Sequence, residues 1–284
     1  MQKNEMKWQW EITSRTSYRL EDIKVLWSYR HFLMSLVRRE FLLNYQQTIL
    51  GPFWLIFPPL VTLVTYIFVF NKMVGISTGT IPPVLFYFSG IVLWNFFSDC
   101  LSGTSTTFKD NADLFGKVYF PRIIIPVSVI CTHFLRFLLQ FAFLLCMVAF
   151  YVFFRNFSIQ FNTWLLFLPL AIVCVGIIAL GMGLIFSVLT AKYRDISNLV
   201  TLGVRLLMFL TPVIYPLNSI SPKWRFLVEI NPLTPLFEVF KMGLLGEGSV
   251  NIGMLLYSMV FTIFILIVAL MIFNKQGAKL IDVV

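Results

Sequence analysis

Residues 211–241 read TPVIYPLNSISPKWRFLVEINPLTPLFEVFK, and this interrupted stretch decides how the chain is organised. It lies between two long apolar stretches and contains five prolines, two of them in the pairs Ser221-Pro222 and Thr234-Pro235. Serine or threonine followed by proline is typical of a helix start, because the hydroxyl can cap the first turn and proline suits the first helical position. The stretch therefore predicts two short helices, neither long enough to cross a bilayer.

The composition of the whole chain indicates a polytopic membrane protein. Of 284 residues, 58% are hydrophobic and only 12% are charged, whereas a soluble domain carries about 25% charged residues. The first 50 residues are charged and interrupted, so we expect no cleaved signal peptide and infer that the first span directs insertion. The four cysteines, scattered in or beside apolar stretches, are expected to be buried free thiols: Cys100, Cys131, Cys146 and Cys174.

Six stretches have the length and apolarity of membrane-spanning helices, which need about 20 residues. The second is expected to continue past its apolar part, and the third is longer than one crossing requires. Pro58-Pro59 is expected to kink the first. The predicted all-α fold thus has six spans, at residues 53–70, 83–98, 123–154, 164–189, 199–215 and 252–273.

Lysine and arginine residues predict the orientation of these spans. With both termini cytoplasmic, fifteen of the 22 Lys and Arg residues lie in inner segments and five in outer segments. Inner segments of membrane proteins carry the positive excess. The stretch 211–241 is then expected on the outer side, between the fifth and sixth spans.

The chain before the first span divides into a polar segment, residues 1–20, and a predicted amphipathic helix, residues 21–45; the six-span membrane domain is then 46–284. A basic helix with tryptophan on its apolar face is expected to lie in the cytoplasmic membrane interface. It could serve as an anchor or as a docking surface for a partner. Its polar stripe is Lys24, Ser28, His31, Ser35, Arg38 and Arg39, and its apolar stripe is Ile23, Leu26, Trp27, Leu33, Met34, Val37 and Phe41.

Four motifs carry a family resemblance. They are REFLLNYQQTILGPFW at 39–54, KVYFPR at 117–122, AKYRDI at 191–196, and the stretch from residue 211 quoted above. Together they resemble the permease subunit of type-2 ABC exporters, in the branch that exports O-antigen, capsule and teichoic-acid polymers. The resemblance implies an inner-membrane permease of bacteria that moves a lipid-linked polysaccharide outward. It also implies an exporter built from two permease copies and two P-loop ATPase subunits.

The sequence contains no nucleotide-binding loop of its own. The pattern G-x-x-x-x-G-K-[ST] does not occur, and Gly176, Gly181 and Gly183 are better explained as small residues that let helices pack closely. We therefore expect no catalytic residue, metal or cofactor in this chain, with ATP and Mg²⁺ bound by the partner ATPase.

The predicted inner loop 99–122 is too polar to face lipid, and the resemblance implies that a loop here carries the coupling helix that docks on the ATPase. Asn111 could cap a short helix over residues 112–116. An ordinary solvated connector is the alternative. The candidate ATPase contacts are Phe108, Asn111, Leu114 and Phe115; Lys192, Arg194 and Asp195 of the next inner loop could add a secondary contact or form only a surface pair.

The outer hairpin, residues 216–246, is expected to dip into the outer leaflet and return. Asn231-Pro232 is expected to end its first helix, and Gly243 or Gly246 its second. Irregular backbone at this depth is tolerated only against protein or a water-filled cavity. The hairpin is therefore expected to roof a conduit and to act as its gate. A passive external cap is the alternative. The candidate gate residues are Trp224 and Leu227 on the first helix, and Phe237 and Phe240 on the second.

Two further sets of residues are candidates for contact with the transported polymer. Arg136 and Arg205 lie inside predicted spans and could bind a phosphate head group, although Arg136 could instead snorkel or pair across a dimer. Sugar rings could slide over flat aromatic faces, but aromatic residues near span ends usually form interface belts. The aromatic candidates are Tyr66, Phe70, Trp94 and Tyr215.

Three other functions remain open at this point. A drug or small-lipid exporter of the same fold would have the same six predicted spans. A membrane enzyme of lipid-linked glycan synthesis would need paired carboxylates on polar loops, but the loop acids are scattered over both sides. A proton-driven flippase should carry central acidic residues in its spans, and the six stretches have none. The positive net charge is explained by the excess of lysine and arginine in the predicted cytoplasmic segments, so no nucleic-acid partner is expected.

Overall fold

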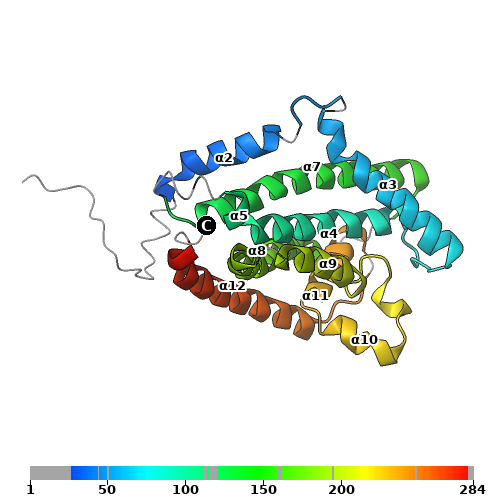
Figure 1. The fold of residues 1–284 in the computed structure, drawn as a ribbon. Helices are drawn as coiled ribbons and strands as arrows, with labels where there is room; N and C mark the ends of the chain where they lie inside the picture. The colour runs from blue at the N-terminus through cyan, green and yellow to red at the C-terminus, as the bar shows by residue number, and fades with distance from the viewer. Residues whose placement is uncertain are drawn as a thin grey trace, which may run out of the picture.

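The computed structural model describes residues 27–43, 45–49, 51–111, 114, 120–158, 162–193, 195–246 and 248–280. These residues form a bundle of helices, without strands in the described part of the chain, as predicted (Figure 1). The predicted polar segment 1–20 and the beginning of the predicted amphipathic helix lie outside the described residues.

Within the described residues, five helical segments are long and apolar enough to cross a membrane. The first runs from Gly51 to Met73 and joins η1 (Gly51–Leu55), α3 (Phe57–Tyr66) and the π-helix η2 (Ile67–Met73). The other four are α4 (Pro83–Ser105), α7 (Ile124–Arg155), η3 with α8 (Thr163–Phe167 and Leu168–Lys192), and α12 (Ile252–Leu280). As expected, α4 continues past its predicted end and α7 is one overlong helix.

The predicted fifth span, 199–215, is not a single crossing helix. The helix α9 (Ile196–Phe209) has 14 residues and is therefore about 21 Å long, short of a hydrocarbon core of roughly 30 Å. Turns follow it up to the short η4 (Leu217–Ser219). The proline at 212 sits in this irregular part, where it cannot continue the hydrogen-bond ladder of α9.

Pro58-Pro59 lies where the first span changes its helix type. Both prolines are in the first turn of α3, directly after the 3-10 helix η1 ends. The first turn of an α-helix has no ladder hydrogen bonds for proline to remove, so both residues are compatible with the start of α3. The kink expected there stays a prediction.

The helix α4 forms the centre of the bundle. It packs against α7, α8, α3 and α9, while α8 also packs against α12 (Figure 1). Close approach of α4 and α8 depends on Gly183, where an added Cβ would lie 2.5 Å from the Cβ of Thr104. The predicted role of the small residues in α8 is confirmed, because added Cβ atoms at Gly176 and Gly181 would also touch side chains of neighbouring helices.

The described part of the predicted amphipathic helix is α2 (Arg30–Leu43), which lies lengthwise beside the first half of α7 (Figure 1). Its buried residues are Leu36 and Val37. Of the predicted apolar stripe, Val37 faces the bundle, but Met34 is 64% exposed and Trp27 is 71% exposed. The buried face is thus rotated from the predicted one, since packing against α7 rather than hydropathy alone sets it.

The irregular segment after α9 is buried against α4. Thr211 and Val213 are fully buried, and a Cβ at Gly90 of α4 would lie only 2.7 Å from the carbonyl oxygen of Val213. Buried carbonyls outside a helix need hydrogen-bond donors. Side chains supply them: the Asn231 amide donates to Leu210 O at 3.1 Å and to Thr211 Oγ1 at 2.9 Å.

The same asparagine determines where the next helix begins. The helices α10 (Pro222–Glu229) and α11 (Leu233–Leu245) follow the irregular segment. α10 starts at Pro222 as predicted. α11 does not start at Thr234-Pro235, because Asn231 Oδ1 accepts the N–H of Leu233 at 3.0 Å and so caps α11 two residues earlier. Thr234 Oγ1 instead donates to Val228 O of α10 at 2.6 Å.

The turn between α10 and α11 is also fastened to α12. Tyr257 OH donates to Ile230 O at 2.9 Å, and Ser258 Oγ donates to Pro232 O at 2.7 Å. At the other end of α11, Gly246 adopts φ 84°, the left-handed conformation that favours glycine, so α11 ends at one of the two predicted glycines.

We predict that Asn231→Ala lowers stability by about 1–3 kcal/mol, because it removes the donor to the partly buried carbonyl of Leu210 and to the buried hydroxyl of Thr211. The measurement is the midpoint of thermal unfolding of the purified chain in detergent. Asn218→Ala, at an exposed asparagine of the same region, is the control and should leave the midpoint unchanged. Equal midpoints for the two variants would contradict the role given to Asn231.

A second pair of variants tests the packing of α4 on α8. Gly183→Ala should destabilise by about 1–3 kcal/mol, since its methyl group would overlap Thr104. Gly203→Ala in α9, where nothing lies within 4 Å of the added Cβ, should be neutral or stabilise by up to about 1 kcal/mol. The measurement is the midpoint of thermal unfolding of the two variants. An unchanged midpoint for Gly183→Ala would show that α4 and α8 can move apart without loss of stability.

Candidate functional site

The outer hairpin divides into an exposed helix and a buried one. On α10, Trp224 is 57% exposed and Leu227 is 47% exposed. On α11, Phe237 and Phe240 are fully buried. The four predicted gate residues therefore do not form one surface, and the two phenylalanines cannot line an open conduit within this chain.

The buried phenylalanines join α11 to two helices of the bundle. The ring of Phe237 lies 6.3 Å from the ring of Trp94 in α4, and that of Phe240 lies 5.9 Å from Phe141 in α7. Such aromatic pairs stabilise a core beyond their buried area. α11 is thus part of the packed core of this chain, where Phe237 and Phe240, predicted as gate residues, contact α4 and α7.

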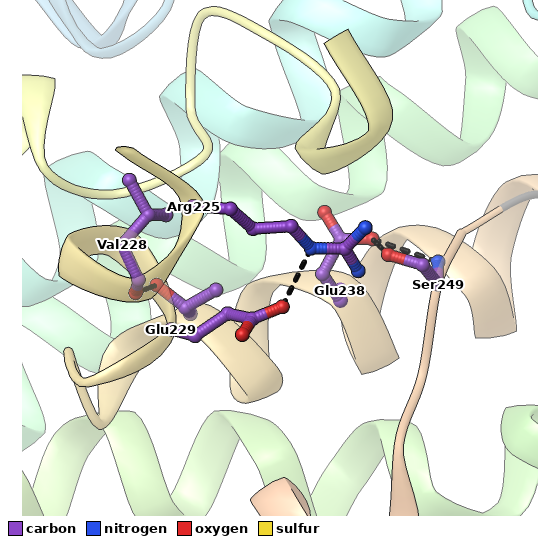
Figure 2. A network of polar contacts seen from close by, with 6 residues as sticks. Arg225, Val228, Glu229, Glu238 and Ser249 are labelled. Carbon is purple, nitrogen blue, oxygen red and sulfur yellow. Dashed lines mark hydrogen bonds and ion pairs between the residues drawn. The ribbon is translucent and has the colours of Figure 1, made fainter. Parts of the chain in front are cut away.

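Figure 2 shows one polar contact within α10 and one between α11 and the chain that follows it. Along α10, Arg225 Nε donates to Glu229 Oε1 at 2.6 Å, a partly exposed pair that adds little stability. Farther along, the backbone N–H of Ser249 donates to Glu238 Oε2 at 2.9 Å and so fastens α11 to the loop that leads to α12.

The loop between α4 and α7 begins with α5 (Thr107–Asp110), which contains Phe108, one of the predicted coupling residues. Phe108 is buried, and its ring stacks on Phe273 of α12 at 5.2 Å between centroids. It is therefore not available to contact another protein. Asn111 Nδ2 donates to Thr107 O at 3.1 Å, so its side chain closes the end of α5.

Of the other two predicted coupling residues, the structure describes Leu114 but not Phe115. Leu114 packs at the edge of a cluster formed by Leu36 of α2 with Phe120 and Ile124. It thereby connects the loop to α2 and α7. The helix predicted over 112–116 and Phe115 lie outside the described residues, as does Arg194 of the next inner loop.

Arg136 belongs to a cluster of ionisable side chains from three elements. Its guanidinium carbon lies 5.9 Å from the ring centroid of Tyr45, and its charge interacts with the carboxylates of Glu40 in α2 and Asp99 in α4. His133 Nδ1 lies 4.0 Å from Asp99 Oδ2. This cluster connects α2, α4 and α7.

The cluster affects what Arg136 can bind. Burial raises the pKa of Glu40 above its ordinary value, and the positive charges of Arg136 and Arg39 oppose that rise. Two carboxylates near Arg136 partly neutralise it, which weakens its attraction for a phosphate. Arg205, by contrast, is exposed on α9, and the two arginines lie on different helices.

The four predicted pore aromatics have different surroundings. Trp94 is buried between the rings of Phe97 and Phe237, so it cannot line a conduit in this chain. Tyr66 OH contacts Met208 Sδ of α9 at 3.3 Å, and its ring lies 5.5 Å from that of Phe70. Tyr215 OH donates to Phe209 O at 2.7 Å. These three residues remain partly exposed.

Glu238 and Lys241, which the sequence interpretation counted only as outer loop groups, are both buried on α11. Lys241 Nζ donates to Pro212 O at 2.5 Å and lies 3.8 Å above the ring of Phe86. Burial lowers the pKa of Lys241 to about 8, although Glu238 acts to raise it. Their three-residue spacing inside an otherwise apolar predicted helix was the signal that could have found them.

The cysteines only partly match expectation: Cys100 and Cys174 are buried, whereas Cys146 is exposed. In the described part of the chain, no group of three or more His, Cys, Asp or Glu residues is placed to hold a metal ion.

Comparison with known proteins reveals relatives over most of the chain. An O-antigen export system permease protein RfbA of Klebsiella pneumoniae is 28% identical over 257 residues, which cover 88% of this chain and 94% of that protein. RfbA of Myxococcus xanthus is 27% identical over 222 residues, 77% of this chain and 82% of that protein. The inner membrane transport permease YadH of Escherichia coli K12 is 22% identical over 201 residues, 68% of this chain and 76% of that protein.

The family model for ABC-2 type transporters matches residues 31–245. This range includes all four motifs of the predicted resemblance and the whole interrupted stretch that follows α9. The chain belongs to the ABC-2 type transporter family.

Proposed function

We propose that this chain is the membrane permease of an ABC exporter that carries a lipid-linked polysaccharide from the cytoplasmic to the outer side of the membrane. The observation that carries the proposal is the likeness to O-antigen export permeases, which extends over 88% of this chain. The family match and the five long apolar helices of the described residues support a transport role in the membrane.

The proposed arrangement has six crossings with both ends in the cytoplasm. α9 and the irregular segment 210–217 together complete the fifth crossing. Irregular backbone can lie at membrane depth where protein surrounds it, and here Thr211 and Val213 are fully buried. The excess of lysine and arginine in the inner segments supports the orientation, and the likeness to an inner membrane permease supports a bacterial inner membrane.

The proposed exporter contains two copies of this chain and two P-loop ATPase subunits. The sequence has no phosphate-binding loop, so ATP and Mg²⁺ are assigned to the partner. Within one chain, Trp94, Phe237 and Phe240 lie in the core, which favours a conduit between two copies over a conduit through one.

A conduit between copies would be lined by side chains that are exposed in one chain. Arg205 and the partly exposed Tyr66 meet this condition. We therefore prefer Arg205 to Arg136 as the contact for a phosphate head group, because Arg136 already interacts with two carboxylates. On the outer side, α10 with Trp224 and Leu227 is the proposed moving part of the gate, whereas α11 is held in the core.

The exporter proposal is tested by deleting the gene and purifying the tagged protein gently from its native membrane. We expect loss of surface polysaccharide, restored by the wild-type gene, and a native mass equal to two permease chains with two P-loop ATPase subunits. A deletion strain with normal surface polysaccharide would contradict the proposed cargo. A lone chain, or one bound to a glycan-synthesis enzyme, would contradict the exporter.

The coupling assignment is tested with Phe115→Asp. A docked helix needs an apolar contact, so a carboxylate at this position should abolish co-purification of the ATPase subunit while the amount of permease in the membrane stays unchanged. Phe108→Ala serves as the comparison, because it removes a buried stacked ring and should lower stability by about 3–5 kcal/mol. Full recovery of the ATPase with Phe115→Asp would remove residue 115 from the interface.

A further inference from the structure

A cavity of about 280 Å³ lies beside α11, between residues 77–81, the turn at 216–219 and residues 248–249. Glu238 and Lys241 are buried in its lining, whereas Asn218 and Ser219 at its rim are exposed. In the proposed orientation all of these segments lie on the outer side. The cavity is near the small end of the range for ligand pockets, roughly 300–1,000 Å³.

The buried part of the cavity carries one positive and one negative side chain. Lys241 Nζ uses one hydrogen bond on Pro212 O, and an ammonium group has three N–H donors. Glu238 Oε2 accepts from the backbone N–H and the hydroxyl of Ser249, at 2.9 and 3.4 Å. A carboxylate can accept at both oxygens, so each side chain retains capacity for a ligand.

Two hydroxyl groups of the lining already donate their hydrogens to backbone carbonyls. Thr78 Oγ1 donates to Ile81 O at 2.8 Å, and Ser219 Oγ donates to Pro216 O at 2.6 Å. Both hydroxyl oxygens still have lone pairs that can accept. The side chain of Asn218 adds an amide with both donors and an acceptor. The lining therefore offers both hydrogen-bond donors and acceptors.

We propose that this cavity binds a single neutral sugar ring of the exported polysaccharide at the outer side of the permease, an inference that rests on the proposed function. A sugar ring presents several hydroxyls, each both donor and acceptor, which matches a lining that offers both donors and acceptors. The opposite charges of Glu238 and Lys241 offset each other, so the cavity has little net attraction for an anion. Its volume suits one ring better than a chain of several.

The test uses the complete exporter, permease with its ATPase partner, in lipid nanodiscs. The probe is the mixture of oligosaccharides released by mild acid from the host's own surface polysaccharide, and saturation-transfer difference NMR detects its binding. Asn218→Trp should fill the mouth of the cavity without disturbing buried packing, because Asn218 is exposed. Lys223→Trp, at an exposed position of α10, is the matched control.

We expect sugar signals with the wild type and with Lys223→Trp, and their loss with Asn218→Trp. Glu238→Gln keeps the shape but removes the charged acceptor, so affinity should fall about tenfold. If Glu238→Gln fails to fold, Asn218→Trp alone decides the matter. Equal signals from Asn218→Trp and the wild type, or no signal from the wild type, would overturn the sugar site.

Two controls separate this inference from the proposed function and from a phosphate site. Inorganic pyrophosphate should not displace the oligosaccharides; displacement would assign the cavity to an anion and overturn the neutral-sugar assignment. If the gene deletion abolishes surface polysaccharide but the binding test fails, the sugar site is disproved and the proposed function is not. A deletion without effect on surface polysaccharide would disprove the proposed cargo itself.

Discussion

Hydrogen bonds from two buried side chains, Asn231 and Lys241, to the carbonyls of residues 210 and 212 hold together the irregular segment on which the outer half of the protein depends. Without these donors, the end of α9 would leave unpaired carbonyls in an apolar surrounding, at a cost of several kcal/mol each in hydrocarbon. The same asparagine begins α11 through Leu233. Because the donors come from α11 and the turn before it, the end of α9 and the start of α11 stabilise each other.

This dependence explains why the outer hairpin is asymmetric. α11 is fixed by its aromatic contacts in the core, by Lys241 and by the bond between Ser249 and Glu238. α10 has mostly exposed side chains and is joined to α11 through the turn and through Thr234. A segment with few buried contacts can be displaced at low free-energy cost, so α10 is held less firmly than α11.

The buried ionisable groups form two separate sets near opposite ends of the bundle. One set, around Arg136, connects α2, α4 and α7 close to the inner loop. The other, Glu238 and Lys241, lies beside the outer loops. Buried charges are expensive unless they are paired or hydrogen-bonded. Lys241 and Glu238 are hydrogen-bonded, whereas Arg136 Nε and His133 Nδ1 are buried without a hydrogen-bond partner among the described residues. Both sets join elements that are distant in sequence.

The amino-acid sequence alone determined the helical membrane class, the positions of most spans, and the family through four motifs. Proline and glycine signals also placed the start of α10 and the end of α11, because these residues restrict the backbone locally. Only the tertiary structure decided which face of each helix is buried: it placed Phe108, Trp94, Phe237 and Phe240 in the core and rotated the buried face of α2. Hydropathy cannot separate these cases, since a lipid-facing and a core-facing side chain are equally apolar. The sequence shows Glu238 and Lys241 inside an apolar predicted helix, but it does not show the partners that make their burial tolerable, Pro212 and Ser249, which only the fold brings beside them.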